Sequence, residues 1–171
     1  MIFRPTELSD CYVIEPERRV DERGFFARTF DADAFTDHGL NPTVSQVSVS
    51  FNAEAGTLRG LHYQRPPHEE AKLVRCTRGR IFDVAVDLAA RRWTAIELSE
   101  ENGLAFYIPE GFAHGFVTLE HASEVLYLIS TPYVPAASAG IRWDDSSLGI
   151  PWPTVGRLTI SERDRNLPTL R

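Results

Sequence analysis

The chain has 171 residues, of which 43% are hydrophobic and 25% are charged, and its formal net charge is −6 at pH 7. These values exclude an intrinsically disordered chain, and the acidic balance argues against a nucleic-acid partner, whose phosphates require a basic surface. The length is typical of one domain with a sizeable core, which we assign to residues 1–171.

One short helix is expected at residues 32–39, where Gly39 can provide a left-handed cap. From residue 43 onward, apolar residues alternate with polar ones, as in strands with one buried face. Gly79 can take the positive φ of a hairpin turn, and a further turn is expected near 161–166. The segments that carry the alternating pattern are 43–51, 57–64, 71–77, 80–88, 105–109, 114–120 and 123–130. So many short strands predict an all-β protein with antiparallel sheets, either a β-sandwich or a jelly-roll barrel, and few helices.

The cellular compartment can be inferred from apolar segments and from the cysteines. No apolar run approaches the roughly 20 residues of a membrane span, and the start has no signal-peptide core, so we expect a cytoplasmic protein without a membrane partner. Cys11 and Cys76 belong to no C-x-x-C pair, which argues against a zinc knuckle. Two buried free thiols are the expected state of these cysteines in a reducing compartment.

A metal site is the first functional hypothesis that the histidines raise. The run PEGFAH (109–114) is similar to the second half of the metal motif of cupin jelly-roll barrels. The first half is incomplete, because His62 is followed by Tyr63 and Gln64 where an H-x-H pair would need a second histidine. A catalytic first-row metal usually needs three well-placed ligands. We therefore expect no metal, and His114 is either a strand-end histidine bonded to backbone or a residue that contacts a ligand.

Taken together, the motifs resemble the dTDP-4-dehydrorhamnose 3,5-epimerase family. The resemblance runs in order along almost the whole chain. It includes DERGFF (21–26), TLRGLHYQ (57–64), KLVRC (72–76), DVAVDL (83–88), IPEGFAHGF (108–116), YLISTPYVP (127–135), GIRWDD (140–145) and SERD (161–164). It implies a cupin-like jelly-roll fold and a reaction without metal or other cofactor. The implied substrates are nucleotide-linked 4-keto-6-deoxyhexoses, epimerised at C3 and C5.

The chemistry of such an epimerisation can be matched to residue types. A ketone acidifies the protons on both neighbouring carbons, so the enzyme needs a base, a cation or donor for the enolate oxygen, and an acid on the opposite face. His62 suits the base, because imidazole titrates near neutral pH, and Lys72 suits the enolate oxygen. The resemblance implies Asp164 as the partner that fixes the His62 tautomer and Tyr133 as the acid. Tyr127 is expected to be a packed strand residue.

The resemblance also implies residues that bind the substrate. Arg23 and Arg59 match phosphate contacts, as expected for a diphosphate held by arginines. Further candidates for contacts with the base or sugar are Phe26, Trp143, Gln46 and His114. Arg23 is expected to reach the site of a second copy, because the family forms homodimers that exchange the N-terminal segment. Without the resemblance, Lys72 would be read as a solvated strand end, Tyr133 as a rim aromatic and Asp164 as a helix N-terminal charge.

Strand geometry conflicts with these assignments at one point. In a regular strand, residues three apart face opposite sides, which would separate Arg59 from His62. Both can face one pocket only if the ladder is interrupted, and Gly60 is the expected site of a bulge.

Two departures from the family pattern leave the substrate open. Arg28 stands where the family often has an acidic residue, and Ser48 stands where it often has an amide. An epimerase acting at C3 alone or on another sugar nucleotide is therefore also consistent with the sequence. The same barrel could instead be a sugar-nucleotide 3,4-ketoisomerase, a non-catalytic sugar-nucleotide binding barrel or a metal-dependent cupin, because one fold hosts several functions.

Overall fold

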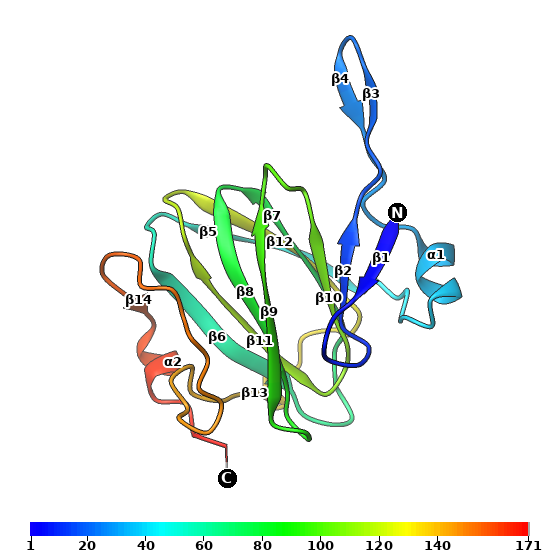
Figure 1. Ribbon diagram of the computed structural model, residues 1–171. Helices are drawn as coiled ribbons and strands as arrows, with labels where there is room; N and C mark the ends of the chain where they lie inside the picture. Colours follow the sequence, from blue (N-terminus) through cyan, green and yellow to red (C-terminus); the bar gives the residue numbers. More distant parts are fainter. Residues whose placement is uncertain (171) are drawn as a thin grey trace.

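The computed structural model describes residues 1–170 and consists mainly of two sheets (Figure 1). The first has the order β1-β2-β10-β7-β12-β5, formed by Ile2–Pro5, Tyr12–Glu15, Ala105–Ile108, Lys72–Arg78, Ser123–Ile129 and Gln46–Asn52. The second has the order β13-β6-β11-β8-β9, formed by Ser138–Gly140, Thr57–Gln64, Phe112–Thr118, Arg80–Asp87 and Arg92–Ser99. β14 (Thr159–Ile160) joins β6 in parallel, and the pairs within the two strand orders are antiparallel. The predicted all-β fold with antiparallel sheets is confirmed.

The two sheets pack face to face around a closed hydrophobic core. Its buried residues alternate along the strands, as expected where one face of each sheet points inward. From the first sheet they include Val74, Cys76, Phe106, Ile108 and Val125, and from the second Ile81, Ala85, Leu98 and Phe116. Cys11 and Cys76 are both buried and unpaired, as predicted.

β8 is buried on both faces, and this decides where its polar residues go. The apolar face carries Val84 and Val86, which pack under Ile141 and Leu148 of the C-terminal segment, on the outside of the barrel. The opposite face therefore points into the barrel, and it carries Asp83, which is fully buried. β8 thus places the carboxylate of Asp83 in the interior of the barrel.

The short elements match the predicted positions. The helix α1 (Ala32–Asp37) begins at an N-cap, Asp31, whose side chain accepts a hydrogen bond from the amide of Ala34, and ends before Gly39 with φ of 73°. The helix α2 (Glu162–Arg165) is capped by Ser161. The C-terminal helix is short, yet its cap fixes the direction in which Asp164 points.

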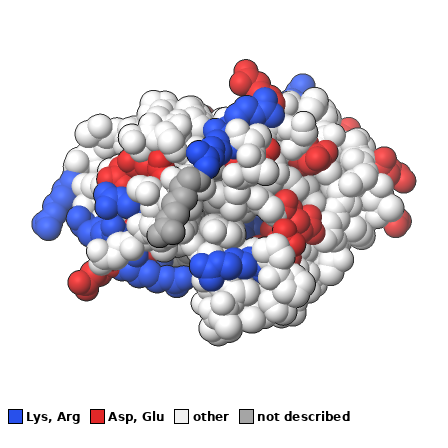
Figure 2. Space-filling view, turned by 90° about the horizontal axis from the view of Figure 1, so that it is seen from below, with Lys and Arg blue, Asp and Glu red and all other residues white. Residues whose placement is uncertain are grey.

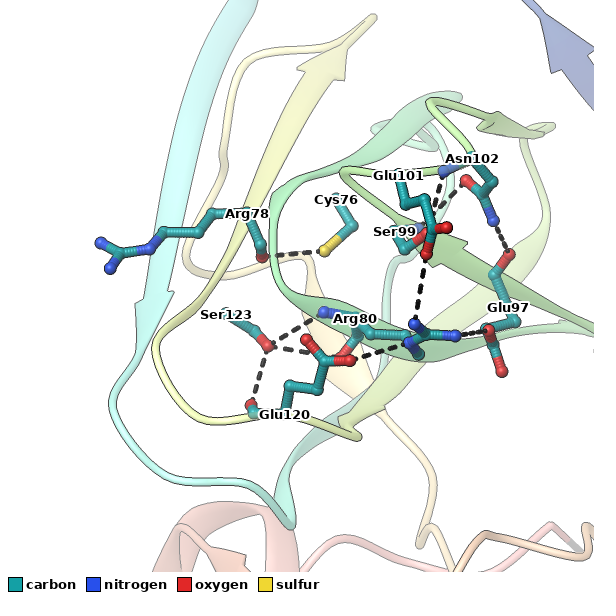
Figure 3. A network of polar contacts seen from close by, with 9 residues as sticks. All are labelled: Cys76, Arg78, Arg80, Glu97, Ser99, Glu101, Asn102, Glu120 and Ser123. Atoms are coloured by element: carbon teal, nitrogen blue, oxygen red, sulfur yellow. Dashed lines mark hydrogen bonds and ion pairs between the residues drawn. The ribbon is translucent and has the colours of Figure 1, made fainter.

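The β7–β8 turn is held by a polar network around Arg80 (Figure 3). Gly79 has the predicted positive φ, 72°, and a Cβ there would lie 2.5 Å from Oγ of Ser123. Arg80 forms ion pairs with Glu97 of β9 at 2.8 Å and with Glu120 of the β11–β12 turn at 2.9 Å. The network ties three turns together at one end of the barrel.

A hairpin arm, β3 (Arg19–Asp21) and β4 (Gly24–Phe26), projects from the barrel (Figure 1). Its two strands pair with each other in a separate two-stranded sheet. Apolar side chains on the arm are unusually open, with Val20 exposed by 76%, Phe25 by 60% and Phe26 by 69%. On the edge strand β5, Val47, Val49 and Phe51 are exposed by 61%, 56% and 54%. Exposed apolar surface on this scale is typical of an interface.

The surface charges are mixed on the face seen from below in Figure 2. Basic side chains gather toward the left and lower part of that view, with acidic side chains among them and toward the right. Neither α1 nor α2, the helices of residues 1–170, is long and apolar enough to span a membrane.

Candidate active site

A cavity of about 330 Å³ lies between the sheets, with walls from β5, β6, β7, β11 and β12. The predicted site residues that line it are His62, Lys72, Tyr133, Arg59, Gln46 and His114. Ser48, Ser50, Glu70 and Tyr127 also line it. The fold therefore collects polar and titratable side chains from both sheets around one hollow.

The predicted bulge at Gly60 explains how Arg59 and His62 share this cavity. His114 of β11 pairs with His62 of β6, but Phe116, two residues on, pairs with Arg59, three residues back. β6 therefore carries one extra residue, and beyond it the side chains that pointed to one face of the sheet point to the other. A Cβ on Gly60 would lie 2.6 Å from Cα of Gly115. The two strands approach so closely here that both positions require glycine.

His62 is held by a buried carboxylate. Its Nε2 lies 2.7 Å from Oδ1 of Asp164, and the amide of Gly60 donates to the other carboxylate oxygen at 3.3 Å. Burial would raise the pKa of Asp164, but the hydrogen bond and charge of His62, with the Gly60 amide, hold that pKa below its usual value. The His62 side chain is 37% exposed and that of Asp164 is 6% exposed. An ionised Asp164 thus binds one ring nitrogen and leaves Nδ1 for a substrate.

Lys72 is the first residue of β7, and its side chain is buried and paired. Its Nζ lies 3.0 Å from Oε1 of Glu70 and 3.3 Å from the carbonyl oxygen of His62. The Lys72 and Glu70 side chains are 8% and 11% exposed. A buried ammonium ion is tolerated when it is paired and hydrogen bonded in this way. The contact with His62 puts the positive charge next to the strand that carries the imidazole.

A second histidine–carboxylate pair lies beside the first. Nε2 of His114 is 2.6 Å from Oδ1 of Asp83, and the two side chains are 6% and 0% exposed. Burial raises the pKa of Asp83 against the opposing effects of His114 and Lys72. Oδ2 of Asp83 is buried without a hydrogen-bond partner among residues 1–170. Burial and the Asp83 charge also raise the pKa of Tyr127, so the Tyr127 hydroxyl is protonated at neutral pH.

Tyr133 stands at the open side of the cavity. It follows β12, its side chain is exposed, and its amide donates to Oε1 of Gln46 at 2.9 Å. His62 comes from β6 of the second sheet and Lys72 from β7 of the first, whereas Tyr133 lies in the loop between β12 and β13. The cavity therefore has the imidazole on one wall, the ammonium ion on the opposite wall and the phenol at its open side.

Three predicted substrate-binding residues lie outside this cavity. Arg23 is at the tip of the arm, paired with Asp21 at 2.5 Å, and Phe26 lines a separate hollow of about 440 Å³ beside the arm. The carbonyl oxygen of Trp143 accepts a hydrogen bond from the indole of Trp152, and Trp143 is not among the cavity walls. Substrate contacts by Arg23, Phe26 and Trp143 remain predictions, and one copy of the chain does not bring these residues to the others.

The chain is similar to known proteins over almost its whole length. The family model described as dTDP-4-dehydrorhamnose 3,5-epimerase matches residues 5–171. The chain belongs to this family. A dTDP-4-dehydrorhamnose 3,5-epimerase of Methanothermobacter thermautotrophicus is 46% identical over 99% of this chain and 94% of its own length. The chain is therefore an isomerase of this class, and its all-β fold is the cupin-like fold of the family.

Solved structures of the dTDP-4-dehydrorhamnose 3,5-epimerase family superpose closely on the chain. The Bacillus anthracis enzyme, solved with TDP and PPi bound, has a TM-score of 0.94 and 37% identity, covering 99% of both chains. The Legionella pneumophila epimerase, in complex with dTDP-4-keto-L-rhamnose, has a TM-score of 0.93 and 34% identity over 99% of this chain and 92% of its own.

Sequence reasoning did not single out some residues that the structure adds to the candidate epimerase site. Asp83 and Glu70 were not assigned a role, and Tyr127 packs against the core as predicted and also lines the cavity. A signal for Asp83 was present, because DVAVDL (83–88) places a carboxylate within a strand that is apolar on its other face. Within residues 1–170, no group of three or more His, Cys, Asp or Glu is arranged to hold a metal ion.

Proposed function

We propose that the chain epimerises a dTDP-4-keto-6-deoxyhexose at C3 and C5, with His62 as the base and Tyr133 as the acid. The observation that carries the proposal is that His62, Lys72 and Tyr133 line one cavity, with His62 bound from behind by Asp164. Each inversion removes a proton from a carbon beside the C4 ketone and returns one to the other face. The same groups serve both carbons in turn, once His62 has released its proton to water and the Tyr133 oxygen has taken one back from water.

The roles follow from the contacts. Asp164 accepts a hydrogen bond from Nε2–H of His62, which keeps that proton on Nε2, so Nδ1 carries the lone pair that takes the substrate proton. The electron pair of the broken C–H bond moves to the C4 oxygen, and Lys72 stabilises the resulting enolate charge. The Tyr133 hydroxyl then donates its proton to carbon. His62 belongs to β6 of the second sheet, whereas Tyr133 lies in the loop that follows β12 of the first, and in this proposal the two act on opposite faces of a sugar ring between them.

We infer that the substrate is held partly by a second copy of the chain. The arm carries Arg23, Phe26 and exposed apolar residues, and the edge strand β5 offers an exposed apolar surface beside the cavity. A homodimer that exchanges the arm would cover both surfaces and bring Arg23 toward the diphosphate. Sedimentation at micromolar concentration tests this, because a monomer would contradict it.

Isotope exchange tests the reaction. In D₂O with dTDP-4-keto-6-deoxyglucose, we expect deuterium at C3 and C5, read by proton NMR. His62→Ala should abolish exchange at both carbons, whereas Tyr133→Phe should allow exchange at a reduced rate of inversion. Deuterium at C3 alone would indicate a C3 epimerase, and a 3-keto product would indicate a 3,4-ketoisomerase. Binding without any exchange would leave a sugar-nucleotide binding barrel and remove the proposal.

A further inference from the structure

We propose that Asn52 is a positioning residue that fixes the guanidinium of Arg59 for a diphosphate while leaving its charge unneutralised. The proposal rests on the proposed function, in which Arg59 binds the nucleotide diphosphate. Asn52 does not line the cavity, and it lies at the end of β5, seven residues before Arg59. It acts, in this proposal, through Arg59 alone.

The orientation of the Asn52 amide follows from its surroundings. The side chain is buried, with 2% of its surface exposed. Its Nδ2 donates to the carbonyl oxygens of Ser123 and Ser50 and to Oγ of Ser50, each at 3.2 Å. Its Oδ1 lies 2.8 Å from Nε of Arg59, which can only donate. The reversed amide would face its NH₂ group toward another donor, so the carbonyl is directed at Arg59.

This contact occupies one edge of the guanidinium and leaves the other for a ligand. Because Nε donates to Asn52, the Nη1 and Nη2 groups remain for the paired oxygens of a phosphate. None of the ion pairs within residues 1–170 includes Arg59. A neutral amide therefore orders the side chain in the free protein without competing with an anion, and less freedom is lost on binding.

The test compares Asn52→Ala with Arg59→Ala and with the double variant. Calorimetry measures the affinity for dTDP and for thymidine, which lacks the diphosphate, and steady-state kinetics separates KM from kcat. We expect Asn52→Ala to weaken dTDP binding and raise KM roughly twofold to tenfold, the cost of ordering one long side chain on binding. Thymidine affinity and kcat should stay unchanged. Added to Arg59→Ala, the Asn52→Ala change should have no further effect.

Two further variants control for folding and charge. Asn102, in the β9–β10 turn away from the cavity, also uses both ends of its side-chain amide in hydrogen bonds. Asn102→Ala should therefore leave dTDP affinity unchanged. Asn52→Ser replaces Asn52→Ala if the latter does not fold, since the shorter side chain cannot reach Arg59 yet keeps a polar group at this buried position. In Asn52→Asp the new side chain can still contact Arg59, but its carboxylate neutralises the arginine. This variant should therefore bind dTDP as weakly as Asn52→Ala does.

The outcomes separate this proposal from the one on which it depends. If Arg59→Ala weakens dTDP binding and a folded Asn52 variant does not, the positioning role is wrong and the phosphate role of Arg59 stands. If Asn52→Ala weakens dTDP equally with and without Arg59, Asn52 acts on β5 rather than on Arg59, which also overturns the proposal. If Arg59→Ala itself leaves dTDP affinity unchanged, the phosphate contact fails, and the role of Asn52 fails with it.

Discussion

Replacing Asp164 with asparagine exchanges one carboxylate oxygen for an NH₂ group and leaves two hydrogen-bond donors with one acceptor. In the wild-type protein the carboxylate accepts from His62 at 2.7 Å and from the Gly60 amide at 3.3 Å. An asparagine has one acceptor for these two donors. If its NH₂ group faces the Gly60 amide, two donors meet. If its NH₂ group faces His62, the imidazole must accept at Nε2 and carry its proton on Nδ1. The proton then occupies the nitrogen that the base needs free.

The size of the effect follows from this tautomer. A positioned general base contributes about 10²–10⁴-fold to a rate, and removing the carboxylate of a Ser-His-Asp triad in the same manner costs about 10⁴. We therefore expect kcat of Asp164→Asn to fall by about 10²–10⁴-fold, or about 2.7–5.5 kcal/mol of activation free energy. KM should change little, because Asp164 is not part of the cavity wall.

The assay is deuterium incorporation at C3 and C5, with dTDP affinity measured alongside. The ¹⁵N shifts of His62 report the tautomer directly. Asp144→Asn is the matched control, since Asp144 forms an exposed pair with Arg142 at 2.6 Å. If folded Asp164→Asn protein exchanges deuterium within about threefold of the wild-type rate, far less than a general base contributes, the role given to the His62–Asp164 pair is refuted.

The remaining predictions concern stability. Gly115→Ala should lower the free energy of unfolding by about 1–3 kcal/mol, because its Cβ would lie 2.8 Å from the carbonyl oxygen of Arg59 and 2.9 Å from Cα of Gly60, both backbone atoms. Urea unfolding measures this loss, and an unchanged midpoint would contradict the close approach of the strands. The pKa of Asp164 is lowered on folding, so its ionised form contributes stability above its unfolded pKa of about 3.9, and that contribution is lost as the pH falls through the lower folded value. The difference in stability between wild type and Asp164→Asn should therefore shrink from pH 7 to pH 3, and a constant difference would count against the shift.

The sequence predicted β5, β6, β7, β8, β10, β11 and β12, because alternation is a local pattern, but it missed the eight-residue strand β9. The helix at 32–39 and the Gly79 turn were also predicted, since capping and positive φ depend on neighbouring residues. The strands β1 and β2 were not predicted. They are four residues each, too short for a periodic signal, and β2 pairs with β10, which lies about ninety residues further on.

The candidate site could be predicted only in part, because its partners are distant in sequence. Asp164 is 102 residues from His62, and Asp83 is 31 residues from His114. The resemblance to the family supplied the first partner. The second follows from burial of both faces of β8, which depends on the C-terminal segment packing outside the barrel. Arg59 could be predicted, but not the Asn52 side chain that holds it.

The two imidazoles sit opposite each other on neighbouring strands, and their surroundings support different roles. His62 has an ionised carboxylate behind it and is partly open to the cavity, which favours uptake of a substrate proton. His114 is almost closed off, and burial raises the pKa of its partner Asp83, which weakens the negative charge available to stabilise an imidazolium ion. The His62–Asp164 pair therefore combines an ionised carboxylate with access to the cavity, whereas the His114–Asp83 pair is closed off from it. Because the bulge at Gly60 turns His62 and Arg59 to one side, a single extra residue in β6 joins this base to the cation proposed to hold the substrate.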